Sequence, residues 1–319
     1  MRDNDFSNPI FHDEEKARAW LEARLWPDGP VCPHCGVIDQ ATLMNGKSHR
    51  LGLYQCNACR EPFTVTVGTL YERSHVPLHK WLAATHLMMA SKKGMSALQI
   101  SRMLGLTYKT SWFLCHRIRE SLRETDPGLL GGSGKIVEAD ETYVGGKERN
   151  KHADKRIGWR RATIYDKEPV VALVERGGRV RSFHMPDVHS SNLRSTLTAQ
   201  IHADTHVMTD QWRGYSTLDR HFAAHSAVNH SIGEYVRGAT STNTVEGYFS
   251  ILKRGIFGTF HHVSAQHLKR YVGEFDYRYN TRTALGFTDF ERFTASVPGV
   301  VGKRLTYRRI GRAERSAQA

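Results

Sequence analysis

The sequence predicts an α/β protein in which a small cysteine-rich module and a helical segment precede a larger domain of strands and helices. Three observations support this prediction. Four cysteines form two Cys-x-x-Cys pairs near the N-terminus, three helical patterns follow them, and strand and helix patterns alternate beyond residue 135. The 319 residues suffice for two or three such units, since domains usually contain ~100 to 200 residues.

The chain carries a large excess of positive charge. Its 45 Lys and Arg residues face 32 Asp and Glu residues, a formal net charge of +13. This excess favours a polyanionic partner, most simply nucleic acid, although a soluble enzyme that is merely basic is the alternative. No apolar run approaches the ~18 residues of a membrane span, and the N-terminus lacks the apolar run of a signal peptide. We therefore expect a soluble, cytoplasmic protein without a membrane partner.

The cysteine pairs predict one structural zinc ion. Cys32 and Cys35 are separated by twenty residues from Cys56 and Cys59, so the chain between the pairs can fold back and complete a tetrahedral site. Four thiolates leave no open position for chemistry on the zinc. Disulfides are the alternative, and they are unusual in a large chain without a secretory signal. We expect a zinc ribbon over residues 31–75, after an N-terminal helical segment at 1–30.

The segment 76–124 is typical of a DNA-binding helix-turn-helix. A helix over 97–104 ends at Gly105, and Thr107 can cap the next helix. Such a unit places the start of its second helix in the major groove of DNA. The alternative is a plain helical hairpin. The residues at the start of the second helix, and so the predicted DNA-reading residues, are Tyr108, Lys109, Thr110 and Ser111.

The larger domain begins with three strand patterns in a meander, followed by a helix, a strand, a second strand and two longer helices. This order is the one expected of a ribonuclease-H-like α/β domain, with a mixed sheet flanked by helices. The strand patterns cover 136–144, 169–175, 180–185, 205–209 and 225–229, and the helical patterns cover 192–201, 244–256 and 264–279.

Three acidic residues occupy informative places in this order. Asp140 lies within the first strand, Asp210 follows the fourth strand, and Glu246 lies early in a late helix. The first and fourth strands are neighbours in such a fold, so the three carboxylates would converge on two Mg²⁺ ions suited to phosphodiester chemistry. Lys253 lies two helical turns after Glu246 and could contact a DNA phosphate.

Structural explanations of the same acids remain open. Glu138 and Glu141 flank Asp140, so a salt-bridge network could account for the cluster. Asp210 could instead cap the helix that follows it. The face from Glu246 to Lys253 could simply be solvated.

Together these motifs resemble the DDE insertion-sequence transposases of the ISXO-like type. The resemblance extends from about residue 12 to residue 290. Some family members have asparagine in the third acidic position, and Asn243 lies one turn before Glu246. The matching segments are 26–36 (WPDGPVCPHCG), 137–146 (VEADETYVGG), 209–210 (TD), 242–254 (TNTVEGYFSILKR) and 275–280 (FDYRYN).

The resemblance implies a ribonuclease-H-like catalytic domain at 135–290. It implies a transposase that binds the terminal inverted repeats of its element and performs Mg²⁺-dependent strand cleavage and transfer, with Mn²⁺ able to replace Mg²⁺. A non-catalytic repressor and a nuclease without joining activity are the alternatives. Because two element ends must be handled together, we expect a homodimer or larger assembly on double-stranded DNA, both element ends and target. The implied catalytic residues are Asp140, Asp210, Glu246 and Lys253, with Arg254 as a further DNA contact.

Under this interpretation, two basic segments are expected to contact DNA. The segment from Lys147 to Lys167 contains eight Lys and Arg residues, and the predicted C-terminal tail at 291–319 brings several more, including Lys303 and Arg304. Contacts between such residues and phosphates position DNA without reading its sequence. Solvated loops that keep the protein soluble are the alternative for both segments.

Overall fold

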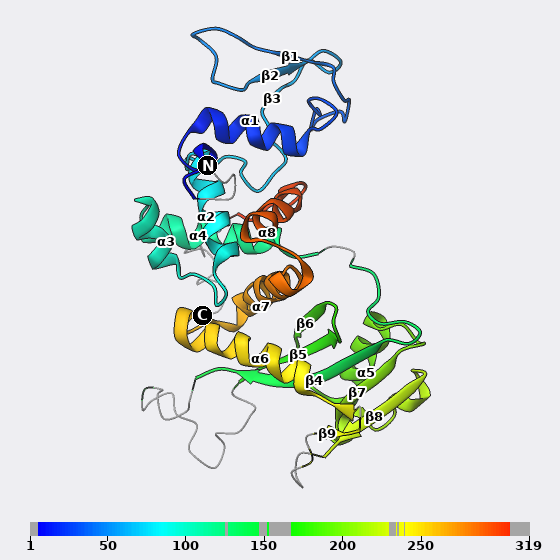
Figure 1. Cartoon of the computed structure of the whole chain (residues 1–319). Coiled ribbons are helices and arrows are strands. Elements are labelled where there is room, and N and C mark those ends of the chain that lie inside the picture. The colour runs from blue at the N-terminus through cyan, green and yellow to red at the C-terminus, as the bar shows by residue number, and fades with distance from the viewer. Residues whose placement is uncertain are drawn as a thin grey trace, which may run out of the picture. The chain divides into compact units, whose positions relative to one another are not determined.

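The computed structural model describes residues 6–124, 127–146, 152, 167–229, 234, 236–238 and 240–306 (Figure 1). The chain forms two compact units. The first unit contains Met1–Ala90, Ala97–Leu122 and Asp289–Ala319, and the second contains Ser91–Ser96 and Arg123–Thr288. No helix in the described part of the chain is both long and apolar enough to cross a membrane.

The first unit begins with a helix and a small antiparallel sheet. Helix α1 (Glu14–Leu25) starts at Asp13, whose side chain accepts hydrogen bonds from the first-turn amides. The sheet that follows has the order β1-β2-β3; Cys32 and Cys35 precede it, Cys56 ends β2 and Cys59 lies in the turn before β3. Its strands are β1 (Ala41–Leu43), β2 (Tyr54–Cys56) and β3 (Pro62–Phe63).

Helices complete the first unit. Helices α2 (Leu78–Ala90), α3 (Ala97–Leu104) and α4 (Tyr108–Ser121) confirm the three helices predicted for 76–124. Gly105, at a φ of +60°, ends α3 in the left-handed conformation that favours glycine. The Oγ1 atom of Thr107 accepts a hydrogen bond from the amide of Thr110 and so caps α4.

One further helix, α8 (Asp289–Ser296), lies largely within the segment predicted as a basic C-terminal tail. Phe293 is fully buried and contacts the rings of Phe11, Trp20 and His86. The beginning of that segment is therefore a packed part of the first unit. The rest of the tail, from residue 307 onward, lies outside the described residues.

The second unit is built on a five-stranded mixed sheet with the order β6-β5-β4-β7-β8. Strands β6, β5 and β4 form the predicted antiparallel meander, while β7 and β8 continue the sheet in parallel with β4. Figure 1 shows the sheet with its flanking helices. The strands are β4 (Ile136–Val144), β5 (Glu168–Glu175), β6 (Val180–His184), β7 (His206–Asp210) and β8 (Ala224–Val228).

Helices cover both faces of this sheet, because successive residues of a strand point to opposite faces. In β5, Val171 and Leu173 join the core cluster that includes helix α5 (Ser190–Gln200). Val170 and Ala172 join a second cluster that includes helices α6 (Asn243–Gly255) and α7 (Ala265–Asn280).

Short elements connect these larger ones. Strands β9 (Val236–Arg237) and β10 (Thr240–Ser241) form an antiparallel pair before α6. A π-helix at Ile256–Phe260 continues α6. The 3₁₀-helices are Pro9–Phe11, Arg213–Tyr215, Leu218–Arg220, Thr283–Leu285 and Val297–Val300.

Candidate active site and metal centres

The register between β4 and β7 brings two of the predicted acids to the same level of the sheet. Glu138 pairs with Met208 across these parallel strands. Asp140 and Asp210 each lie two residues further along, so both side chains leave the sheet on the same face as Glu138. Side chains far apart in the sequence therefore become neighbours because β4 and β7 are adjacent.

The third predicted acid lies in the first turn of α6, and the β4 strand fixes where that helix begins. Glu138 is fully buried, and its carboxylate accepts hydrogen bonds from the amides of Thr244 (2.8 Å) and Val245 (3.0 Å) and from the Thr244 hydroxyl (2.9 Å). A carboxylate at this place satisfies amides that have no partner within the helix. Glu246 follows directly, with an exposed side chain.

A buried ion pair supports this helix start. Arg176, just after β5, donates from Nε to Glu138 at 2.6 Å and from Nη2 to the backbone and hydroxyl oxygens of Ser241, just before α6. A salt bridge therefore does exist among the acids around Asp140, as the structural alternative expected, but the acid that forms it is Glu138. No ion pair links Asp140 or Asp210 to a basic side chain among the described residues.

Asp140 is surrounded by other acids. Burial first, and then the nearby carboxylates of Glu141, Asp210 and Glu246, together raise the pKa of Asp140 to about 8, although a hydrogen bond from the Glu141 amide lowers it. This mutual influence shows that the three predicted acids share one electrostatic environment. Carboxylates that raise one another's pKa in this way would be stabilised by a divalent cation.

Glu141 is a fourth acid at this place, and it has a specific partner. The hydroxyl of the buried Tyr215 donates to Glu141 at 2.7 Å. Burial raises the pKa of Glu141, the Tyr215 hydrogen bond lowers it, and Asp210 raises it. Asp210 also accepts a hydrogen bond at 3.0 Å from the Trp212 amide, at the start of the turn into a 3₁₀-helix. Asp210 therefore bonds the turn that precedes this 3₁₀-helix but does not cap the helix, whose N-cap residue is Trp212.

The donor set suits magnesium, because hard divalent cations bind carboxylate oxygens. The spacing is looser than in the cysteine cluster. Among the described residues, only the cysteines form a group of three or more potential ligands within 4.8 Å of one another. The three carboxylates of Asp140, Asp210 and Glu246 do not form such a close group in this structure.

The outer face of α6 carries the predicted basic residues. Lys253 and Arg254 are exposed in the last turn, and Arg254 contacts Ser250 through its guanidinium. Asn243, the first residue of α6, is also exposed. Most of the basic segment from Lys147 to Lys167 lies outside the described residues.

The first turn of α4 presents three of its four predicted DNA-reading residues. Tyr108 is 56% exposed, Lys109 is exposed, and Thr110 is half-buried with its hydroxyl bonded to that of Thr107. Ser111 is fully buried, so its prediction as a DNA-reading residue was wrong. It lies one turn before Leu114 and Cys115, on the face of α4 that packs inside the first unit.

The four cysteines form a site with the dimensions that zinc requires. Cys32 and Cys59 have their Sγ atoms 3.7 Å apart, as do Cys35 and Cys56. Zn–S bonds of about 2.3 Å in a tetrahedron place the sulfurs ~3.8 Å apart. The Cys59 amide lies 3.5 Å from the Cys56 sulfur and lowers the pKa of Cys56 to about 6, which favours the thiolate that binds zinc. The cysteine set therefore fits one zinc ion.

One polar contact escaped prediction, although its residues were noted in the segment 275–280. Asp276 accepts hydrogen bonds from the Ser182 amide and hydroxyl, both at 2.8 Å, and from Tyr248 at 2.6 Å. Asn280, one turn later, bonds the backbone N–H and C=O of Val180. These two side chains fasten α7 to β6. The spacing of four residues between Asp276 and Asn280 predicts that both lie on one face of a helix, but it does not reveal which strand that face contacts.

Comparisons with known proteins agree with this organisation. Residues 129–280 match the ISXO2-like transposase domain family, and residues 12–61 match the transposase zinc-ribbon domain. The chain is 30% identical over 277 residues to an uncharacterized protein in transposable element ISH50 of Halobacterium salinarum, covering 84% of this chain and 91% of the relative. It is 26% identical over 102 residues to an uncharacterized transposase-like protein of Haemophilus influenzae, covering 32% of this chain and 81% of the relative.

The zinc-ribbon and transposase-domain matches place the chain in the transposase class. It belongs to the ISXO2-like transposase family.

Proposed function

We propose that this protein is a DDE transposase that binds the terminal inverted repeats of its own element and carries out Mg²⁺-dependent strand cleavage and strand transfer. One observation supports this most strongly. Asp140 and Asp210 lie at the same level of two adjacent parallel strands, and Glu246 lies in the first turn of a helix that Glu138 anchors to one of those strands. The sheet order, with an antiparallel meander beside two parallel strands, is consistent with a ribonuclease-H-like core.

In the proposed reaction, Asp140, Asp210 and Glu246 are the residues that would hold two Mg²⁺ ions. Bound Mg²⁺ would activate the attacking hydroxyl and stabilise the leaving oxygen. Water first attacks a phosphodiester at the element end, so one P–O bond forms, another breaks and a 3′-hydroxyl is released. That hydroxyl then attacks a target phosphodiester and displaces a 3′-oxygen, so the number of phosphodiester bonds is unchanged. Lys253, on the exposed face of α6, contacts the DNA phosphate beside the metals.

The first unit supplies DNA recognition in this proposal. Helices α3 and α4 pack together across the Gly105 turn, as in a helix-turn-helix. Tyr108, Lys109 and Thr110 are the proposed DNA-reading residues, while the buried Ser111 is not. Two element ends must be processed together, so a homodimer or larger assembly forms on DNA.

The test is a cleavage and joining assay on a labelled duplex that carries the repeat end, which is found by sequencing the DNA flanking the gene. With Mg²⁺, a transposase gives joined products, a nuclease gives only cut strands, and a repressor only binds. Asp140→Asn and Asp210→Asn should abolish joining and preserve DNA binding. Asp204→Asn is the matched control, because Asp204 is exposed just before β7. Joining by either active-site variant at the wild-type rate would refute the metal assignment.

A further inference from the structure

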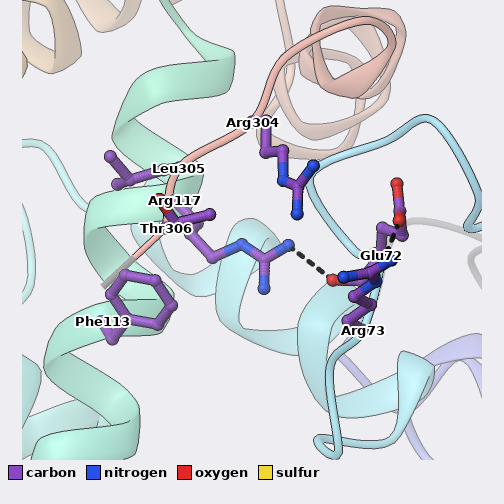
Figure 2. A pocket seen from close by; sticks show the side chains of 7 residues that line it. All are labelled: Glu72, Arg73, Phe113, Arg117, Arg304, Leu305 and Thr306. Atoms are coloured by element: carbon purple, nitrogen blue, oxygen red, sulfur yellow. Dashed lines mark hydrogen bonds and ion pairs between the residues drawn. The ribbon is translucent and has the colours of Figure 1, made fainter. Parts of the chain in front are cut away.

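A basic cavity of about 190 Å³ lies in the first unit between α4 and the C-terminal segment (Figure 2). Figure 2 shows the side chains of Arg117 and Arg304 reaching toward the same space from different elements. Arg73 and Phe113 also line it. A cavity with three guanidinium groups and one carboxylate, that of Glu72, favours an anionic occupant.

Arg117 is the central residue of this cavity, and its guanidinium is only partly satisfied. The residue is 7% exposed, and its Nη2 donates to the backbone oxygen of Glu72 at 3.1 Å. Its Nε atom is buried without a hydrogen-bond partner. The guanidinium lies over the rings of Trp81 and Phe113, at 5.2 and 5.7 Å from their centroids. A buried cation with an unused donor is costly unless an acceptor completes its shell.

Arg304 adds a second positive charge to the same space. Burial lowers the pKa of Arg117, and among the surrounding charges Arg304 lowers it further while Glu72 opposes this. The negative charge of Glu72 is shared between Arg117 and Arg73, because a Glu72 carboxylate oxygen lies 3.4 Å from Nε of Arg73. Two guanidinium groups thus face each other across a cavity whose one carboxylate already has a partner.

The backbone holds Arg304 at this position. The Leu70 amide donates to the backbone oxygen of Val300, and the Gly302 amide donates to the backbone oxygen of Gly68. The chain at 300–302 is therefore paired with the chain at 68–70. Nζ of Lys303 then bonds the backbone oxygen of Ser121 at the end of α4. Arg304 follows directly, so its approach to Arg117 is a consequence of the fold.

The cavity continues toward the proposed DNA-reading residues. A second cavity of about 360 Å³ shares Arg73, Phe113 and Arg117 with the first and extends to Lys109 and Thr110 in the first turn of α4. A duplex read by this turn would bring its phosphate backbone close to the shared guanidinium groups. A free anion or a nucleotide in the first cavity would have no such continuity with the reading helix.

We propose that Arg117 and Arg304 together bind one backbone phosphate of the DNA duplex, a site that flanks the reading residues and rests on the proposed function. The phosphate oxygens accept hydrogen bonds from the two guanidinium groups and neutralise their repulsion. Because phosphates are the same in every sequence, this contact adds affinity and sets the register of the duplex without specifying bases.

The test measures affinity for the repeat-end duplex and for an unrelated duplex across a salt series, by fluorescence anisotropy. Arg304→Ala should weaken both complexes by about tenfold and reduce the slope of log K against log salt by about 0.9. Lys109→Ala should instead reduce mainly the preference for the repeat end. Arg117→Lys keeps the charge but loses the two-pronged geometry, so it should also weaken both complexes.

Arg24→Ala is the matched control, because Arg24 is exposed in the same unit outside the cavity. Arg304 is itself exposed, so Arg304→Ala should leave the melting temperature unchanged. This variant therefore tests the site even if the Arg117 variants fold poorly. Unchanged affinity and salt slope for Arg304→Ala, or an equal loss for Arg24→Ala, would overturn the phosphate site while leaving the proposed function intact. A wild-type protein that bound neither duplex would overturn both.

Discussion

The carboxylate of Glu138 in β4 accepts a hydrogen bond from the backbone amide of Thr244 at 2.8 Å and so caps helix α6 from the neighbouring sheet. The two residues are more than one hundred positions apart in the sequence. Through this contact the strand that carries Asp140 also determines where Glu246 lies. Glu246, the proposed third metal ligand, is thus positioned by another acid whose own carboxylate is bonded to the α6 amides and to Arg176.

We predict that Glu138→Ala lowers the free energy of unfolding by about 1 to 3 kcal/mol, because Arg176 loses its carboxylate partner and the amides of Thr244 and Val245 lose their acceptor. Glu138→Gln should cost less and raise the Mg²⁺ concentration needed for half-maximal joining, since α6 keeps one acceptor but loses the charge. Urea unfolding and Mg²⁺ titration measure the two effects. Glu168→Ala, on the same sheet and 41% exposed at its side chain, should change stability by less than about 1 kcal/mol. A Glu138→Gln protein with wild-type Mg²⁺ dependence would contradict the positioning role.

The cysteine site predicts one zinc ion per chain by elemental analysis. Cys32→Ser should remove that zinc and lower the melting temperature, because the ribbon has a small core of its own around Phe63. A strong chelator should have the same effect on the wild type. Cys115→Ala is the control, since Cys115 lies in α4 apart from the cluster and should leave zinc content unchanged. Wild-type protein that contains no zinc would contradict the assignment.

The raised pKa of Asp276 predicts that the stability of the protein depends on pH. Burial raises its pKa to about 6 from an ordinary value of 3.8, although hydrogen bonds from Tyr248 and Ser182 lower it. The folded state therefore holds the proton more tightly than the unfolded chain, and the stabilisation is full below about pH 4 and is lost as the pH rises through 6. The stability advantage of wild type over Asp276→Asn should fall by up to about 3 kcal/mol across that range.

Urea unfolding at several pH values measures this difference. The exposed Asp204 provides the control, because Asp204→Asn should give a difference from wild type that changes little over the same range. An advantage that stayed constant between pH 4 and pH 7 would contradict the raised pKa of Asp276.

Gly299 predicts a steric limit in the first unit. A Cβ atom at this position would lie 2.3 Å from the backbone oxygen of Ser121, a contact that a side-chain rotation cannot relieve. Gly299→Ala should therefore destabilise the first unit by about 1 to 3 kcal/mol, measured by thermal unfolding. Gly258→Ala is the control, because a Cβ atom at Gly258 would have open space around it. Gly302 is unsuitable as a control because its φ is positive, so an alanine there would be strained in any case. Equal melting temperatures for Gly299→Ala and wild type would contradict the close approach.

Much of the local structure could be predicted from the sequence. The bounds of β4 at 136–144 and of α3 at 97–104 agree with the predictions, because alternation and helical periodicity are properties of neighbouring residues. The cysteine spacing likewise indicated the zinc site. The acids of the proposed active site could be ranked because charges are rare inside strands, although their catalytic roles remain predictions.

The parts that could not be predicted depend on tertiary contacts. Nothing in the sequence around Glu138 indicates that its partners are the Thr244 and Val245 amides. Ser111 was misjudged because the position of a residue in the first turn does not reveal which face of a helix packs inward. Helix α8 is short, and it is stabilised mainly by the packing of Phe293 against distant rings.

The attachment of α7 has a consequence for how the sheet can associate. Strand β6 is an edge strand, and its outward amides at Val180 and Ser182 are occupied by Asn280 and Asp276. An incoming strand from another chain would have to displace both side chains before it could pair there. The helix thus protects this edge from strand addition, so a second copy of the protein could not extend the sheet at β6 without breaking these contacts.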